Sequence, residues 1–238
     1  VFFQVMSQGV FLGVANMRGV LGLLPEMALV AIGVTLLMIC GEFDLSVGSV
    51  FALSPMTLAV LMTMGWGFWP ALLIGLLVCA AIGLANGWLT IRFAIPSFIT
   101  TLGMLFMARS LTIVISGGFP PRLKTDEIPM WLFVEFVGLA GTIQVLRIGS
   151  PLPSIGEGLE LAAVAAAVIG GTSLLGGIGS IIGGIVGATL IRVIDNGMVL
   201  SQVNGNWFKF AIGALTILAV VGNSWLRKRG RAMKVETA

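Results

Sequence analysis

The chain has 238 residues, of which 58% are hydrophobic and 10% are charged, and its formal net charge is +3. A soluble domain carries about 25% charged residues, so this composition excludes a water-soluble fold and predicts an integral membrane protein. The chain contains no histidine. It therefore lacks the commonest general base and the commonest protein ligand for metal ions.

A helix needs about 20 mostly apolar residues to cross a bilayer. The candidate segments, in chain order, are Val1–Val14 (partial), Met27–Gly41, Leu45–Met64, Trp69–Ile91, Phe93–Gly118, Ile128–Leu146, Leu161–Gly171, Gly177–Leu200 and Phe210–Leu226. The chain does not begin with methionine, so we expect the first crossing to be clipped. Several segments are short or contain polar breaks, which survive at membrane depth only inside protein or beside a wet cavity. The sequence thus predicts an all-α fold: a polytopic transmembrane bundle with broken helices, forming one domain over residues 1–238.

The first break is the stretch "GEFDLSVGS" at residues 41–49, which lies between two apolar runs. A carboxylate facing the bilayer centre costs roughly 2.5–3.5 kcal/mol. A cheaper arrangement ends one helix at Gly41 and starts the next near Leu45, with Asp44 or Ser46 as the N-cap. Two alternatives stay open for Asp44: it borders a polar path for a solute, or it is a buried cap that never meets the solute.

The second break, "GGTSLLGG" at 170–177, repeats the pattern Gly-x-x-(Asp or Ser)-Leu-x-x-Gly of residues 41–48. A weaker echo pairs "ANGWLT" with "DNGMVL". Matching broken helices in two halves are typical of duplicated transporter folds, so we expect an internal duplication.

Small residues and polar residues near the breaks have different expected roles. Glycines at four-residue spacing lie on one helix face and let another backbone approach closely. We assign that packing role to Gly48, Gly179, Gly183 and Gly187. The candidates for lining a solute path are Asp44, Ser46, Ser49, Asn86, Thr100, Thr101, Thr172 and Ser173. Cys40 and Cys79 lie in apolar runs and are expected to be buried structural residues.

The charged residues predict the orientation of the chain. The tail after the last apolar run carries Arg227, Lys228, Arg229, Arg231 and Lys234, which places the C-terminus in the cytoplasm. The loops on either side of residues 128–146 lack a basic excess and are both expected outside. One crossing cannot return to the side it left, and Glu135 lies within this segment. The sequence therefore predicts either a hairpin there or chain that is absent near residues 133–137.

Ionisable residues beside the apolar runs are few, and most are expected near helix ends: Glu42, Asp44, Arg92, Arg109, Arg192 and Asp195. A proton- or sodium-coupled carrier usually needs more of them. The chain also lacks the Gly-x-x-x-x-Gly-Lys-(Ser/Thr) pattern that holds nucleotide phosphates. The energy for active transport would have to come from another chain.

Four stretches resemble, in order, the membrane permeases of ATP-binding-cassette (ABC) sugar importers of the ribose, xylose, arabinose, galactose and autoinducer-2 group. They are "GEFDLSVGSVFAL", "IRFAIPSFITTLGMLFMARS", "GEGLELAAVAAAVIGGTSLLGGIGSIIGGIVGA" and "IDNGMVL". The resemblance covers nearly the whole chain and implies about ten crossings in the full-length family. Two departures stand out: Glu42 and Phe43 replace the usual Gly-Ile, and the family's cytoplasmic coupling loop has no counterpart near residues 133–137.

The resemblance implies a transport subunit and not an enzyme, in the bacterial inner membrane. Its implied partners are a second permease subunit (homo- or heterodimer), a cytoplasmic ATPase that binds the ATP and a periplasmic solute-binding protein; no cofactor, metal or nucleic acid is expected on this chain. The expected cargo is a monosaccharide or similar small polar solute. The alternatives are an ATP-independent facilitator or secondary carrier for a neutral solute, and a purely structural membrane subunit.

Overall fold

The structure is a computed structural model that describes residues 2–119, 121, 154, 156–203, 207–208 and 210–222. The expectations for the segment 128–146, including the absent chain near 133–137, and for the basic tail fall outside these residues. The same holds for the orientation of the C-terminus.

The described residues form helices and contain no strand, which confirms the all-α prediction. The helices are α1 (Phe2–Met6), α2 (Val14–Ile39), α3 (Val47–Thr63), α4 (Phe68–Phe93), α5 (Ser97–Ile115), α8 (Leu159–Ile169), α9 (Ile181–Leu200) and a further helix, Phe210–Gly222. Among them, α2, α4, α5 and α9 are long and apolar enough to cross a membrane. The chain is therefore a polytopic helical membrane protein.

Several helix boundaries differ from the sequence prediction. Residues 2–13, within the predicted partial crossing Val1–Val14, form only the five-residue helix α1 followed by turns. Helix α9 begins at Ile181 and not at Gly177. Helix α2 begins at Val14 and not at Met27, because it continues through Pro25. Membrane helices tolerate an internal proline where neighbouring groups or a local helix adjustment satisfy the freed backbone carbonyl. Helix α5 begins at Ser97 and not at Phe93. Ala94 has a left-handed backbone (φ 51°) and Pro96 precedes the first turn of α5, so the chain reverses direction between α4 and α5.

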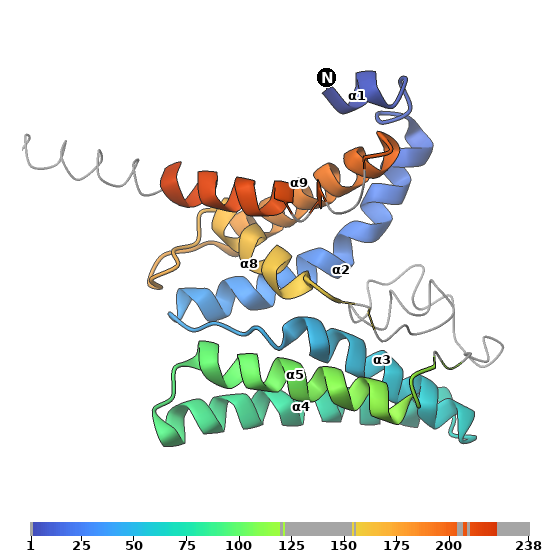
Figure 1. Cartoon of the computed structure of the whole chain (residues 1–238), viewed down its shortest axis with the longest axis vertical. Helices are drawn as coiled ribbons and strands as arrows, with labels where there is room; N and C mark the ends of the chain where they lie inside the picture. The colour runs from blue at the N-terminus through green and yellow to red at the C-terminus, as the bar shows by residue number, and fades with distance from the viewer. Residues whose placement is uncertain are drawn as a thin grey trace, which may run out of the picture. The chain divides into compact units, whose positions relative to one another are not determined.

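The chain divides into two compact units. The first comprises Val1–Gly41 with Ala162–Ala238, and the second comprises Glu42–Leu161. In the second unit, α3, α4 and α5 pack side by side (Figure 1). In the first unit, α2 and α1 pack against α9. That the chain acts as one permease domain stays a prediction about function.

In the second unit, α3 is the central helix, because it packs against both α4 and α5. Its side chains Leu53, Met56 and Ala59 are completely buried. A Cβ added at Gly75 of α4 would lie 2.8 Å from the carbonyl oxygen of Ser54, so the backbones of α3 and α4 nearly touch.

Glycines allow equally close contacts in the first unit. A Cβ at Gly183 would meet the carbonyl oxygen of Gly170, and a Cβ at Gly187 would meet that of Ala166 in α8. A Cβ at Gly179 would lie 2.6 Å from Cγ1 of Ile39. The start of α9 thus lies backbone to backbone against α8.

A buried ion pair joins α2 to α9 in the same unit. Glu26 lies near the middle of α2 with 1% of its side chain exposed, and its Oε2 lies 3.7 Å from a terminal nitrogen of Arg192. The other terminal nitrogen of Arg192 lies 3.6 Å from Oδ2 of Asp195. Arg192 lies in the interior of α9 (Ile181–Leu200), whereas most of the ionisable residues were expected near helix ends. Its partner Glu26 was overlooked in the sequence.

Replacing Gly183 with leucine should disrupt the contact between α8 and α9, because a branched side chain cannot fit between touching backbones. We expect a lower yield of folded protein in detergent. Gly33→Leu is the matched control, since a Cβ at Gly33 of α2 has no atom within 4 Å. Equal yields for the two variants would contradict the close packing.

Arg192→Leu should lower the thermal stability of the purified protein, because it breaks the buried ion pair with Glu26, and breaking such a pair costs about 3–5 kcal/mol. Adding Glu26→Leu should recover much of the lost melting temperature, since two apolar side chains can replace a buried ion pair. A double variant no more stable than Arg192→Leu would show that the ion pair is not the source of the effect.

Candidate functional site: the polar helix breaks

The first predicted break exists, and it lies close to the predicted position. Helix α2 ends at Ile39, Gly41 adopts a left-handed backbone (φ 85°) and α3 begins at Val47, two residues after Leu45. Only a residue without a Cβ takes this φ readily. Cys40 is exposed at the break, which corrects the expectation that it is buried.

Side chains at the start of α5 form hydrogen bonds with the non-helical segment 42–45 between α2 and α3. The backbone N–H of Phe43 donates to Oγ of Ser97 (3.0 Å), and that of Leu45 donates to Oγ1 of Thr101 (3.1 Å). Thr101 in turn donates to the carbonyl of Ser97 (2.8 Å). Ser97 was missed in the sequence; its only signal is its position directly after Pro96, where a helix can start.

Asp44, Ser46 and Asn86 form one hydrogen-bonded chain. Oδ1 of Asp44 accepts from the backbone N–H (2.7 Å) and the hydroxyl (2.6 Å) of Ser46. Nδ2 of Asn86, on α4, donates to the Ser46 hydroxyl oxygen (3.0 Å). Ser46 occupies the N-cap position of α3 without a capping bond from its own side chain. The turn before α3 is therefore fixed by the Asp44 carboxylate and tied to α4 by Asn86.

Other candidate side chains keep polar atoms without a hydrogen-bond partner in the described part of the chain. These atoms are the hydroxyl oxygens of Ser49, Thr100 and Thr172 and Oδ1 of Asn86, all buried. Buried polar atoms are nearly always hydrogen-bonded to protein or water. We call Ser49, Thr100, Thr172 and Oδ1 of Asn86 the open polar group, because their bonds remain available to water or a solute.

The second predicted break is also present, in the first unit. Helix α8 ends at Ile169, and α9 begins at Ile181 after Ser180, whose side chain accepts from the N–H of Gly183. The N–H of Gly177 donates to the carbonyl of Ile39 (2.8 Å), so the loop is bound to the end of α2. Both breaks exist, while their origin by duplication stays a prediction.

The eight candidate path residues belong to different units. Thr172 and Ser173 lie in the first unit, and the hydroxyl of Ser173 accepts from the N–H of Leu175 in its own loop. The other six lie in the second unit. There, Asp44, Ser46, Asn86 and Thr101 belong to the hydrogen-bonded network of the first break.

Gly48 lies where the first turn of α3 meets the beginning of α8. A Cβ at Gly48 would meet the carboxylate of Glu160 and the carbonyl oxygen of Gly156. Oε1 of Glu160 accepts from the N–H of Gly158 (3.2 Å). Glu160 was not among the sequence candidates, yet it brings a second carboxylate to the start of α3.

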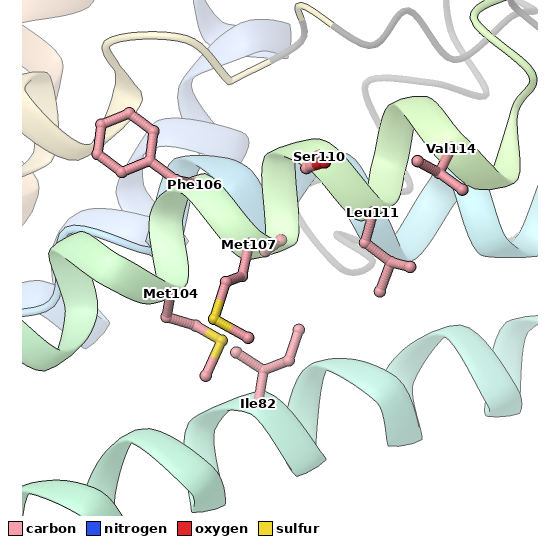
Figure 2. A pocket seen from close by; sticks show the side chains of 8 residues that line it. Ile82, Met104, Phe106, Met107, Ser110, Leu111 and Val114 are labelled. Atoms are coloured by element: carbon pink, nitrogen blue, oxygen red, sulfur yellow. The ribbon is translucent and has the colours of Figure 1, made fainter.

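An apolar groove of about 650 Å³ lies between α4 and α5. Figure 2 shows Met104 and Met107 of α5 pointing toward Ile82 of α4. Ser110 is the single polar residue in its lining, and none of the eight candidate path residues takes part. This groove does not have the hydrogen-bonding groups that a polar solute needs.

Within the described residues, no group of three or more histidine, cysteine, aspartate or glutamate side chains could hold a metal ion.

Comparison with known proteins identifies the family. The family model described as "Branched-chain amino acid transport system / permease component" matches residues 16–137 and 134–220. The two matches overlap at residues 134–137, next to the place where the sequence predicts absent chain, and that expectation stays a prediction. No solved structure matches the chain.

Several curated relatives are similar over most of their length. They include the autoinducer 2 import system permease proteins LsrC of Yersinia pestis (strain Pestoides F), Yersinia pestis bv. Antiqua (strain Angola) and Yersinia pseudotuberculosis serotype O:3 (strain YPIII). Each is 30% identical over an alignment of 260 residues. The alignment covers 84% of this chain and 74% of the relative. The resemblance to ABC sugar-importer permeases is confirmed, and the chain belongs to the family of permease components of ABC transport systems.

Proposed function

We propose that this permease forms the translocation path of a bacterial ABC importer for a monosaccharide or a similar small, neutral, polar solute. The observation that carries the proposal is the open polar group, whose members lie beside the first break in the second unit and, for Thr172, at the second break in the first unit. Its members are uncharged hydroxyl and amide groups, which can exchange hydrogen bonds with the hydroxyls of a passing solute. The relatives named above import autoinducer 2, which supports a small polar cargo.

The charges around the first break favour a neutral solute over a solute that carries a carboxylate, such as an amino acid. The network contains the carboxylate of Asp44 and no cationic side chain among the described residues. Arg92 lies exposed at the end of α4 with its guanidinium 6.0 Å from the ring centre of Phe93. A solute carboxylate would need a cation at hydrogen-bonding distance to offset its desolvation.

The proposed assembly contains a second permease subunit, a cytoplasmic ATPase that binds ATP and a periplasmic solute-binding protein, with the C-terminus of this chain in the cytoplasm. Uptake against a concentration gradient that stops when the ATPase is inactivated would support this assembly. Uptake that continues down the gradient without ATP would favour a facilitator or secondary carrier instead. A chain that matters only for assembly would tolerate every substitution in the open polar group.

Two adjacent threonines allow a role in the solute path to be distinguished from a role in structural hydrogen bonding. Thr101→Val should lower the melting temperature, because the N–H of Leu45 loses its acceptor and an unsatisfied buried group costs about 1–3 kcal/mol. Thr100→Val should leave the melting temperature nearly unchanged, since the Thr100 hydroxyl has no partner in the described structure. Uptake per assembled complex should nevertheless fall in Thr100→Val, measured with labelled monosaccharides, autoinducer 2 and leucine. Normal uptake by that variant would remove Thr100 from the path.

The natural cysteines report whether water reaches the first break. We expect a water-soluble maleimide to modify Cys40, which is exposed at the break, much faster than Cys79, which lies between α3 and α4 with its Sγ 3.6 Å from the carbonyl of Val50. Transported solute should slow the reaction. Cys40→Ser removes the signal and Cys79→Ser is the matched control. An unreactive Cys40 in the assembled importer would contradict a water-filled path at this break.

A further inference from the structure

Aromatic side chains mark both ends of α4. Trp69 and Phe68 pack edge to face near its start, and Trp88 and Phe93 do so near its end. Trp69 and Trp88 are 56% and 60% exposed. Tryptophan gathers at the two interfaces of a bilayer, where its ring sits at the level of the head groups.

The spacing of these two tryptophans matches the thickness of a bilayer. The 19 helical steps from Trp69 to Trp88 correspond to about 29 Å at 1.5 Å per residue, and a hydrocarbon core is about 30 Å thick. Between them the exposed large side chains of α4 are Leu73, Leu77 and Leu84, and no residue from 70 to 87 is charged.

We propose that α4 presents this face, from Trp69 to Trp88, directly to lipid, with the two tryptophans at the two boundaries of the hydrocarbon core. The occupant of the face is therefore the acyl-chain region of the bilayer. The apolar groove lined by Ile82 and Met107 lies at the depth of the acyl chains, because Ile82 falls between the two tryptophans. Apart from Ser110 its lining is apolar, as contact with lipid requires.

This placement of α4 along the bilayer normal, which we call its register, also gives the depth of the polar network at the first break. Asn86 precedes Trp88 by two residues, or about 3 Å along the helix axis. Asn86 is bonded to Ser46, and Ser46 to Asp44. These three residues therefore lie at one boundary of the hydrocarbon core and not at its centre. The inference depends on the chain being a membrane protein and is independent of its solute.

Depth-dependent fluorescence quenching tests the register in the full chain reconstituted into phosphatidylcholine vesicles. One variant keeps only Trp88 and another only Trp69, with phenylalanine at the other tryptophan positions. Lipids brominated near the head group should quench both more strongly than lipids brominated near the methyl end. The control carries Leu77→Trp without any natural tryptophan; it should show the opposite order and a blue-shifted emission. Stronger quenching of Trp69 and Trp88 by the deep bromines would overturn the register.

A second measurement needs few substitutions and guards against misfolded tryptophan variants. A nitroxide is attached at Leu77→Cys or at Trp88→Cys in the chain that carries Cys40→Ser and Cys79→Ser. The Leu77 label should collide mainly with oxygen, and the Trp88 label relatively more with a water-soluble nickel complex. A Leu77 label that collides with neither would show that protein, such as a second permease subunit, covers this face, and the proposal would be wrong.

Discussion

A backbone N–H that leaves a helix inside a membrane protein costs several kcal/mol unless another protein atom accepts its hydrogen. Three N–H groups of residues 40–46 meet this requirement by donating to side chains, two of which lie outside the segment. Ser97 and Thr101 accept from two of the N–H groups, and Asp44 accepts from a third. The reversal of the chain at Pro96 places the first turn of α5 beside the break. The polar break can exist because the α4–α5 turn supplies its acceptors.

Such constraints explain which features the sequence could predict. Glycine, aspartate and serine inside apolar runs have few stable arrangements, so both breaks were predicted near their true positions. The start of α2 was not, because Pro25 and Glu26 resemble a helix boundary while buried contacts keep the helix continuous. The burial of Glu26 depends on Arg192, which is distant in the sequence, and no local pattern indicates such a pair.

The roles of individual polar residues were harder to predict than the breaks. Thr100 and Thr101 are neighbours of the same type, and both were assigned to the path. Successive helical residues point about 100° apart, so one hydroxyl reaches the segment at Phe43–Leu45 and the other does not. Ser97 also accepts from a backbone N–H of this segment, and its only signal in the sequence was its position directly after Pro96. Composition identifies the polar regions. The direction in which each residue points from its helix decides whether its side chain forms a structural hydrogen bond or keeps its polar atom without a partner.

The ion pair between Glu26 and Arg192 also bears on how the chain enters the membrane. Helix α2 is synthesised before α9, and the roughly 165 residues between Glu26 and Arg192 take about 10–30 s to follow at about 5–20 residues per second. During that interval the Arg192 guanidinium is not yet available to Glu26, and an intramembrane carboxylate costs a few kcal/mol. Long apolar stretches on both sides of Glu26 offset that cost. Helix α2 thus enters the membrane before the ion pair can stabilise it, and the pair forms only after α9 has been synthesised.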